Sequence, residues 1–136
     1  MEIRAYAMYN EQEILNLYGS VGWTSYTDSP AMLRAAFAGS LLVLGAFEGK
    51  RLIGLIRAVG DGASIVYVQD ILVHPEHRRR GVGTALLQTV MERYQTVYQM
   101  CLMTDASEET IAFYRSCGLT KAEDMDCCGF MRVYRA

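Results

Sequence analysis

The sequence predicts a single domain of the α+β class over residues 1–136, with one mixed sheet and the element order β-α-α-β-β-β-α-β-α-β-β. Three observations support this prediction. The length of 136 residues corresponds to one ordinary domain. The spacing of apolar residues changes several times between the helical and the strand period. A strand–helix–strand segment over residues 63–103 has the length that a crossover connection needs.

The N-terminal third is expected to contain one strand and two helices. Asn10 followed three residues later by Glu13 has the pattern of a capping box at a helix start. Pro30 suits the first turn of a second helix, and Gly39 suits its end. The expected elements are a strand over 1–6, a helix over 10–21, a loop over 22–28 and a helix over 29–39.

From residue 41 onward, the spacing of apolar residues changes to the period of strands, and the chain is expected to end with two more strands. Gly49, the glycines at 60 and 62, and Pro75 mark turns or strand ends. Gly118 marks the end of the last helix, whose start is expected at the capping pattern from Asp105 to Glu108. The expected elements are strands over 41–47, 52–59 and 63–73, a helix over 81–94, a strand over 97–103, a helix up to 117, and two strands within 119–134 joined near 123–126.

Composition excludes several classes of protein. Apolar residues make up 51% and charged residues 21%, a balance typical of a globular protein rather than a disordered one. The net charge of −2 argues against a nucleic-acid binder. The longest apolar stretch, residues 41–47, is too short to span a membrane, and the first residues do not resemble a signal peptide. We therefore expect a cytoplasmic protein without a membrane or nucleic-acid partner.

Four cysteines occur, at positions 101, 117, 127 and 128. No pair has the C-x-x-C spacing of a zinc site, and adjacent side chains are poorly placed for a mutual disulfide. The sequence predicts neither a metal site nor a disulfide, and it favours a reducing compartment.

The most informative stretch joins the strand that ends near residue 73 to the following helix. Gly81 and Gly83 begin this helix, directly after Arg78, Arg79 and Arg80. Unpaired N–H groups at a helix start bind phosphate, and glycine lets the ligand approach the main chain closely. The alternative interpretation is a solvated basic loop. A Rossmann fingerprint would need a third glycine where Leu86 stands, and no P-loop lysine is present.

Two motifs together resemble the GNAT N-acetyltransferase superfamily. Arg78-x-x-Gly81-x-Gly83, after a strand and Val-x-Pro, is similar to the acetyl-CoA signature of that family. The segment from Ala112 to Leu119, read A-F-Y-R-S-C-G-L, is similar to its second signature. The resemblance covers nearly the whole chain. It implies the GNAT fold and transfer of an acetyl group from acetyl-CoA to an amine in a ternary complex, and family members often form homodimers.

The resemblance also implies roles for individual residues in binding coenzyme A. The backbone of Leu72 and Val73 would pair with the pantetheine arm. Ser107 stands where the family often has an asparagine that contacts this arm, and the serine side chain has a shorter reach than asparagine. The pyrophosphate would be held by Arg78, Arg79, Arg80, Gly81, Val82, Gly83 and Thr84.

Acetyl transfer needs an acid and a base. Tyr114 matches the general acid of the family beside the sulfur of coenzyme A; without that pattern it reads as a packed aromatic residue. The candidate base is Asp70, near the end of the cofactor strand, and the alternative is a hydrogen-bonded residue at a strand bulge. A base is needed because a primary amine with a pKa near 10 is protonated at neutral pH.

Trp23 and Tyr26 are candidates for the acceptor site, because in this fold the segment between the first two helices lines the acceptor side. Aromatic walls suit an aryl-alkyl amine or a polyamine. The alternative is that Trp23 anchors the segment to the core. Two other functions remain open: a non-catalytic acyl-CoA-binding module, and a protein lysine or N-terminal acetyltransferase. An unrelated nucleotide-phosphate binder is disfavoured by the missing third glycine and the missing P-loop lysine.

Overall fold

The computed structural model describes residues 1–135 and divides the chain into two compact units, Met1–Cys101 and the residues from Leu102 onward. The first unit contains β1 (Glu2–Ala5), α1 (Glu11–Ser20), α2 (Thr24–Thr27), α3 (Pro30–Ala38), β2 (Leu42–Glu48), β3 (Arg51–Gly60), β4 (Ile65–Val73), a 3-10 turn (Pro75–His77) and α4 (Val82–Arg93). β5 (Gln99–Leu102) ends at the boundary, and α5 (Glu108–Ser116) and a second 3-10 turn (Ala122–Met125) follow.

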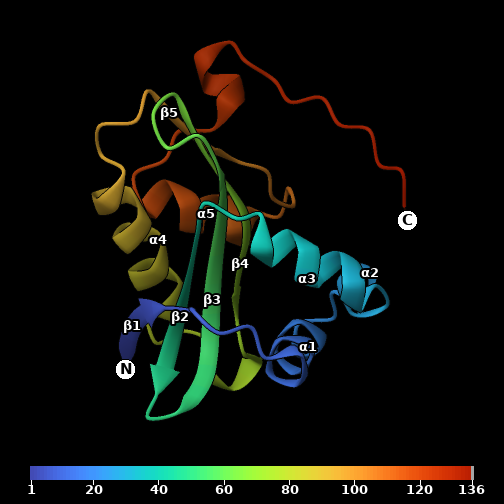
Figure 1. The fold of residues 1–136 in the computed structure, drawn as a ribbon. Coiled ribbons are helices and arrows are strands. Elements are labelled where there is room, and N and C mark those ends of the chain that lie inside the picture. Colours follow the sequence, from blue (N-terminus) through green and yellow to red (C-terminus); the bar gives the residue numbers. More distant parts are fainter. Residues whose placement is uncertain (136) are drawn as a thin grey trace. The chain divides into compact units, whose positions relative to one another are not determined.

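The five strands form one sheet in the order β1-β2-β3-β4-β5 (Figure 1). The pairs from β1 to β4 are antiparallel, and α4 connects β4 to β5. Two backbone hydrogen bonds tie the start of β5 to the chain just before β4: the Tyr98 N–H donates to the Ala63 carbonyl, and the Gln99 N–H donates to the Ser64 carbonyl. This arrangement confirms the α+β class.

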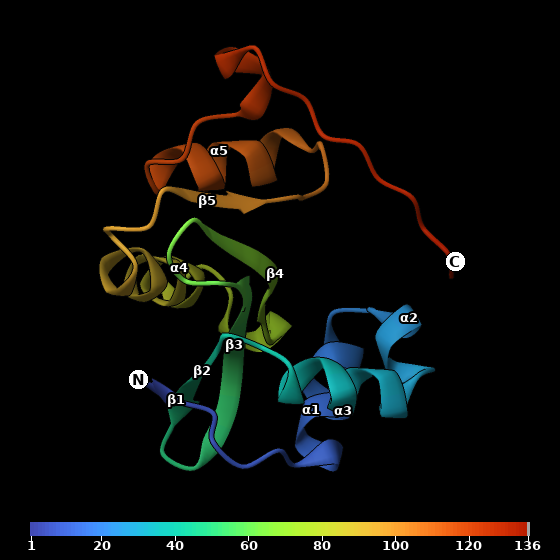
Figure 2. The same ribbon diagram turned by 45° about the horizontal axis from the view of Figure 1, so that its top comes forward.

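Helices cover both faces of strands β2 to β4, as Figure 2 shows within the first unit. On the face of α1 and α3, one buried apolar cluster combines side chains of both helices with side chains of β2, β3 and β4: Ile14, Leu17, Tyr18, Leu33, Phe37, Phe47, Leu52, Leu55 and Leu72. On the other face, α4 lies close to Gly54 of β3, where a Cβ atom would stand 3.0 Å from Val82 Cγ1. The glycine therefore lets α4 approach the sheet.

The register between β3 and β4 contains a bulge. Arg57 faces Asp70, but the next residue, Ala58, faces Val68, so Gln69 is an extra residue on β4. A bulge re-aims the side chains next to it. Here both Arg57 and Asp70 are buried, although each is charged.

Several helix boundaries agree with the capping residues in the sequence. Asn10 is the N-cap of α1, and its side chain accepts a hydrogen bond from the Glu13 N–H at 3.1 Å. Pro30 begins α3, and Gly39 ends it. The segment 22–28, expected to be a loop, contains the one-turn helix α2. Hydrogen bonds from the Thr27 and Asp28 N–H groups to Trp23 and Thr24 stabilise this turn.

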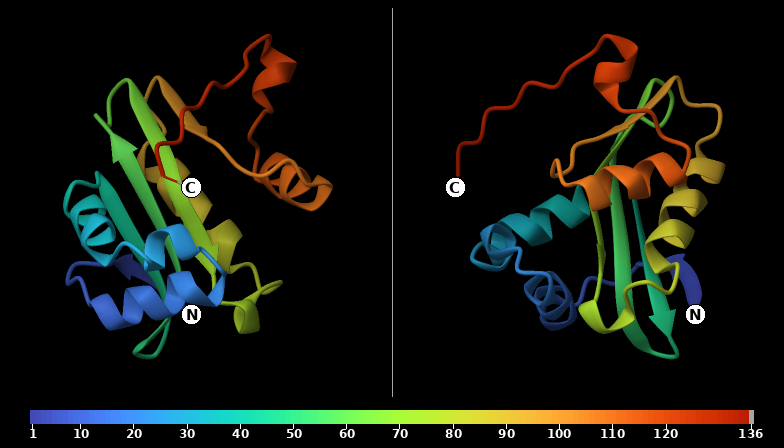
Figure 3. Two further views of the ribbon diagram at one scale, coloured as in Figure 1. Left: turned by 90° about the vertical axis from the view of Figure 1, so that its right-hand side faces the viewer. Right: turned by 180° about the vertical axis from the view of Figure 1, so that it is seen from behind.

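The prediction of two strands within residues 119–134 is wrong. This segment contains the 3-10 turn, then a left-handed residue, Asp126 (φ 58°), and then an extended chain without a ladder up to residue 135. Figure 3 shows this last part in red, running on without a strand arrow. Alternating apolar residues form a strand only when a neighbouring edge accepts their backbone hydrogen bonds.

Candidate active site

The loop between β4 and α4 presents backbone donors at a helix start. Gly81 is the N-cap of α4 and has a left-handed conformation (φ 78°), and Arg79 has one as well (φ 63°). The first N–H groups of α4 have no partners within the helix, and the helix dipole adds positive potential there. Gly83 and Thr84 lie in this first turn, while the side chain of Val82 is buried. The geometry fits a phosphate group.

The three arginines of the loop are exposed but differ in their partners. Arg80 Nη1 lies 4.0 Å from a carboxylate oxygen of Glu48 and 3.5 Å from Nδ1 of His77. Within residues 1–135, Arg78 and Arg79 have no ion-pair partner in the protein. Two guanidinium groups therefore remain available to an anionic ligand at this loop.

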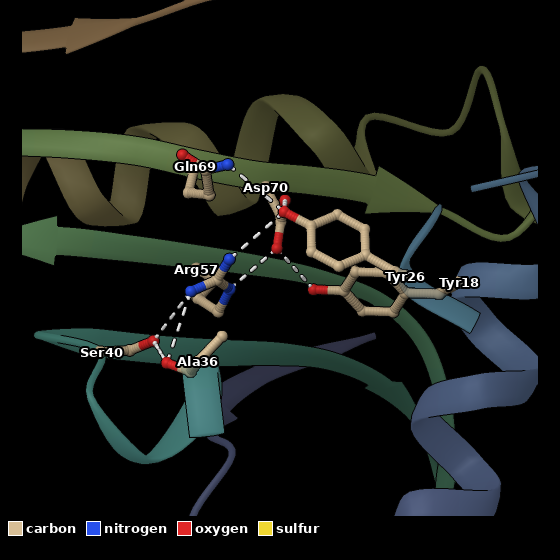
Figure 4. Close-up of polar contacts among 7 residues, drawn as sticks. All are labelled: Tyr18, Tyr26, Ala36, Ser40, Arg57, Gln69 and Asp70. Atoms are coloured by element: carbon tan, nitrogen blue, oxygen red, sulfur yellow. Dashed lines mark hydrogen bonds and ion pairs between the residues drawn. The ribbon is translucent and has the colours of Figure 1, made fainter. Parts of the chain in front are cut away.

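A second cluster lies on the sheet face of α1 and α3 and centres on Asp70 (Figure 4). The carboxylate, whose residue is only 2% exposed, accepts three hydrogen bonds. Arg57 Nε donates to Oδ2 at 2.8 Å, the Tyr18 hydroxyl donates to Oδ2 at 2.9 Å, and the Tyr26 hydroxyl donates to Oδ1 at 2.7 Å. We call these four residues the Asp70 cluster.

The Asp70 cluster connects three helices to two strands. Tyr18 belongs to α1 and Tyr26 to α2, while Arg57 extends its Nη1 to the Ser40 hydroxyl at 3.3 Å and to the Ala36 carbonyl at the end of α3. The segment predicted to line the acceptor site is thus fixed to the strand predicted to hold the cofactor.

The carboxylate also changes the protonation of its neighbours. Burial, followed by the charge of Asp70, raises the pKa of Tyr18 and of Tyr26, so both phenols stay protonated in neutral solution. Burial alone would lower the pKa of Arg57, but the adjacent carboxylate outweighs it and the pKa of Arg57 is raised. The cluster is therefore an ion pair with two neutral phenol donors.

The hydrogen-bonded position of Asp70 at a strand bulge matches the structural alternative to the base role, and it limits how this carboxylate can act. A carboxylate offers about four acceptor positions, and the cluster fills three. Oδ1 receives one donor and has capacity for another, whereas Oδ2 receives two. A proton can reach Oδ1 directly or through the hydroxyl of Tyr26, which is the half-buried member of the cluster.

Trp23 and Tyr26 lie together beside Tyr18, partly buried against the core. The ring centroids of Trp23 and Tyr18 are 5.7 Å apart, and those of Trp23 and Tyr26 are 6.2 Å apart. This packing supports the interpretation that Trp23 anchors its segment to the core. The indole is only partly buried, so part of the ring is accessible.

A separate polar pocket of about 460 Å³ lies beside α1. Glu13, Arg51 and His74 are among its lining residues, and neither Trp23 nor Tyr26 lines it.

The second unit holds the other predicted site residues, Tyr114 and Ser107. Tyr114 is partly buried on α5, and burial raises the pKa of its phenol, whereas a hydrogen bond with Thr104 acts in the opposite direction. Ser107 is the N-cap of α5: its hydroxyl accepts from the Thr110 N–H at 3.2 Å and donates to the Thr110 hydroxyl at 2.9 Å. The expected capping box at Asp105 is therefore replaced by a cap at Ser107.

Sequence reasoning missed Arg57 and Tyr18 as members of the site. Arg57 had a detectable signal, because a lone charge inside the apolar run 52–59 requires a buried partner. Tyr18 had no such signal, since a tyrosine in an apolar helical stripe is typical of a core residue.

Within the described residues 1–135, no group of His, Cys, Asp or Glu side chains is arranged to hold a metal ion. In the same residues, no helix has the length and hydropathy of a membrane span.

Comparison with known proteins defines the class of this fold and site. Residues 6–119 match the acetyltransferase (GNAT) family, so the chain belongs to that family. A GNAT-family acetyltransferase from Streptococcus pneumoniae has a similar solved structure: the TM-score is 0.88 and the identity 35%, over 99% of this chain and 98% of that one.

Two further relatives differ in what they act on or bind. Glucosamine 6-phosphate N-acetyltransferase from Schizosaccharomyces pombe is 27% identical over 56 residues, which are 41% of this chain and 50% of that protein. This chain thus spans half the length of that relative. An aminoglycoside 6'-N-acetyltransferase, solved with coenzyme A, shares the fold with a TM-score of 0.70 and 18% identity, over 87% of this chain and 84% of the other.

Proposed function

We propose that this protein is an acetyl-CoA-dependent N-acetyltransferase that acts on the primary amine of a small molecule by direct attack in a ternary complex. The observation that carries the proposal is the left-handed Gly81 at the start of α4, in the loop that follows the strand that holds Asp70. It combines a phosphate-binding loop with an ionisable cluster in one unit.

The loop residues fit coenzyme A, and the GNAT-fold neighbour solved with that molecule supports the assignment. The N–H groups from Gly81 to Thr84 and the side chains of Arg78 and Arg79 would bind the pyrophosphate. Arg80, which already faces Glu48, would contribute less. Ser107 would contact the pantetheine arm only by giving up part of its interaction with Thr110.

Leu72 and Val73 would hold the pantetheine arm through their backbone. The side chain of Leu72 is buried in the core on the α1 side, so only its main-chain groups are available. β4 pairs with β3 as far as Val73, and two hydrogen bonds from the start of β5 reach the chain just before β4, at Ala63 and Ser64. The pantetheine arm would add as an extended ligand to the side of β4 that faces away from β3, near Val73.

Acetyl-CoA supplies the activated acetyl group, and the protein moves two protons. Asp70 would accept a proton from the acceptor amine at Oδ1, directly or through the Tyr26 hydroxyl, which passes its own proton to Oδ1 as it receives one. The neutral nitrogen then forms a bond to the acetyl carbon while the carbon–sulfur bond breaks, and the nitrogen releases its second proton to solvent as the amide forms. Tyr114 would donate its hydroxyl proton to the departing sulfur and regain a proton from solvent, and the raised pKa keeps the phenol protonated at neutral pH.

The acceptor would lie against Trp23 and Tyr26. A half-buried indole beside a phenol suits an aryl-alkyl amine or the aliphatic part of a polyamine, and an ammonium group gains cation–π attraction on the way in. We also propose a cytoplasmic location, supported by the four free cysteines of the described chain.

One observation favours a second candidate function, a non-catalytic acyl-CoA-binding module. Asp70 already accepts hydrogen bonds from three donors, one of them cationic, which is also the environment of a purely structural carboxylate. In that case the cluster would serve to fix α1 and α2 to β4, and acetyl-CoA would bind without turnover.

A thiol-release assay with acetyl-CoA separates these functions. The panel contains aryl-alkyl amines, polyamines, amino acids, aminoglycosides and lysine or N-terminal peptides. Thiol release with a small amine supports the proposal, and release with peptides alone supports a protein acetyltransferase. Calorimetric binding of acetyl-CoA without release from any acceptor supports the binding module.

A further inference from the structure

Gln69, the extra residue of the β4 bulge, lies beside the Asp70 cluster. Its Nε2 atom donates a hydrogen bond of 3.3 Å to the Tyr26 hydroxyl (Figure 4). Successive side chains of a regular strand point to opposite faces of the sheet. The bulge turns both Gln69 and Asp70 toward the face of α1 and α2, since both contact Tyr26. Unlike Asp70, Gln69 is exposed, so a ligand can reach its amide group.

The hydroxyl of Tyr26 has no acceptor capacity left for a ligand. A phenol oxygen donates one hydrogen bond and has two lone pairs with which to accept. It donates to Asp70 Oδ1 at 2.7 Å, and it accepts from Gln69 Nε2 at 3.3 Å and from Arg57 Nη2 at 3.4 Å. Arg57 is buried and paired with Asp70, so Gln69 is the donor that can leave without breaking the ion pair.

The oxygen of the same amide group is unused. In the part of the chain that the structure describes, residues 1–135, Oε1 of Gln69 accepts no hydrogen bond. An amide has donor nitrogen on one side and acceptor oxygen on the other, so a half-turn about its last torsion angle exchanges the two. The half-turn frees a lone pair on the Tyr26 oxygen and places Oε1 beside it. Two neighbouring acceptors next to a carboxylate match an ammonium group, which carries only donors.

We propose that Gln69 binds the acceptor: its amide turns when the amine arrives, and Oε1 then accepts a hydrogen bond from the ammonium group. This role rests on the proposed acetyl transfer and identifies the form of the acceptor that binds, the protonated primary amine. A second N–H of the ammonium group reaches the Tyr26 oxygen that Gln69 has vacated, and its proton leaves by the route to Asp70. The bond to Oε1 is present before and after this proton leaves, so it contributes to acceptor binding rather than to kcat.

Two substitutions separate this role from that of a donor that merely holds Tyr26 in place. Gln69→Glu keeps an acceptor oxygen but, when ionised, cannot donate to Tyr26, whereas Gln69→Met keeps the side-chain length and does neither. We expect Gln69→Met to weaken the binding of an aryl-alkyl ammonium ion by about tenfold. Gln69→Glu should bind this ion at least as tightly as the wild type, because its carboxylate attracts the cation. Equal weakening in the two variants would overturn the proposal.

Calorimetric titration of phenethylamine into protein saturated with coenzyme A measures this affinity, because no acetyl group is present for transfer. Gln88→Met is the matched control: Gln88 is an exposed glutamine of α4, and its loss should change the affinity by less than about twofold. The cation of N,N-dimethylphenethylamine has a single N–H, which the oxygen of Tyr26 takes. Its affinity should therefore be the same in Gln69→Met and in the wild type, and a loss equal to that of phenethylamine would contradict the contact to Oε1.

The thiol-release assay with the same variants distinguishes a failure of this contact from a failure of the proposed function. Binding of phenethylamine that depends on Gln69 as described, without thiol release from any amine, supports the contact and contradicts acetyl transfer. Thiol release by a Gln69→Met variant whose acceptor affinity and acceptor KM are unchanged overturns the contact alone. A wild type that binds no amine of the panel overturns both.

Discussion

Arg57 and Asp70 face each other across β3 and β4, and their side chains form an ion pair of 2.8 Å that is almost completely buried. Buried ion pairs are not strong stabilisers by themselves, but removing one partner leaves a charge in a site that cannot solvate it. This relationship determines what can be changed in the site without unfolding it.

Arg57→Met should destabilise the protein by about 3–5 kcal/mol, because it leaves the Asp70 carboxylate buried without its cation. The change in the free energy of unfolding is measured by urea denaturation. Arg51→Met is the matched control, since the pair of Arg51 with Glu76 is exposed and should contribute no more than about 1 kcal/mol. Equal losses in the two variants would contradict the role of the cluster.

Gly81→Val should weaken the binding of acetyl-CoA strongly while the protein stays folded. A side chain there meets no protein atom within 4 Å, so the damage comes from the left-handed backbone and from obstruction of the phosphate. Calorimetric titration measures the affinity. Gly22→Val is the control, because Gly22 has the same φ of 78° and the same open surroundings. Similar affinity in both variants would remove the loop from the site.

Tyr114→Phe should lower kcat by roughly 10²-fold with little change in the affinity for acetyl-CoA, because the ring stays and only the proton donor is lost. The pKa of Tyr114 is raised, so the wild-type phenol stays protonated at neutral and mildly alkaline pH, and its ionisation should give no loss of kcat there. Rates are measured by thiol release under conditions where chemistry limits turnover. A change within about twofold would return Tyr114 to a packing role.

Asp70→Asn should lower kcat by roughly 10²-fold or more for amines of high pKa, and by less for amines that are already neutral at the assay pH. The dependence of the loss on amine pKa is the signature of a base. Tyr18→Phe serves as the control: it removes one donor from the same carboxylate but leaves Asp70 in place, so any loss should be the same for all amines. A uniform loss in Asp70→Asn would make Asp70 a positioning residue.

The sequence was sufficient to predict local structure but not the partners of the site. Asn10, Pro30 and Gly39 act within a few residues of their own position, so their effects on α1 and α3 can be read locally. The hydrogen bond from Tyr18 to Asp70 joins residues 52 positions apart, and its existence depends on the bulge at Gln69. A strand bulge at Asp70 was one of the two interpretations of the sequence, but the local pattern does not indicate which side chains hydrogen-bond to the carboxylate.

The wrong prediction for residues 119–134 has a related cause. Phe130, Met131, Val133 and Tyr134 have the composition of a strand, but a strand is defined by the edge it pairs with. Ser107 stands at the position where a cofactor contact was expected. Its side chain instead accepts a hydrogen bond from the Thr110 N–H and caps α5.

Identification of the acetylated product tests the central claim most directly. The protein is incubated with acetyl-CoA and an aryl-alkyl amine, and in parallel with the alcohol of the same skeleton, and the products are analysed by mass spectrometry. We expect the N-acetyl amide from the amine, no ester from the alcohol, and no product with Gly81→Val. Tight binding of acetyl-CoA with no amide from any amine of the panel would contradict it.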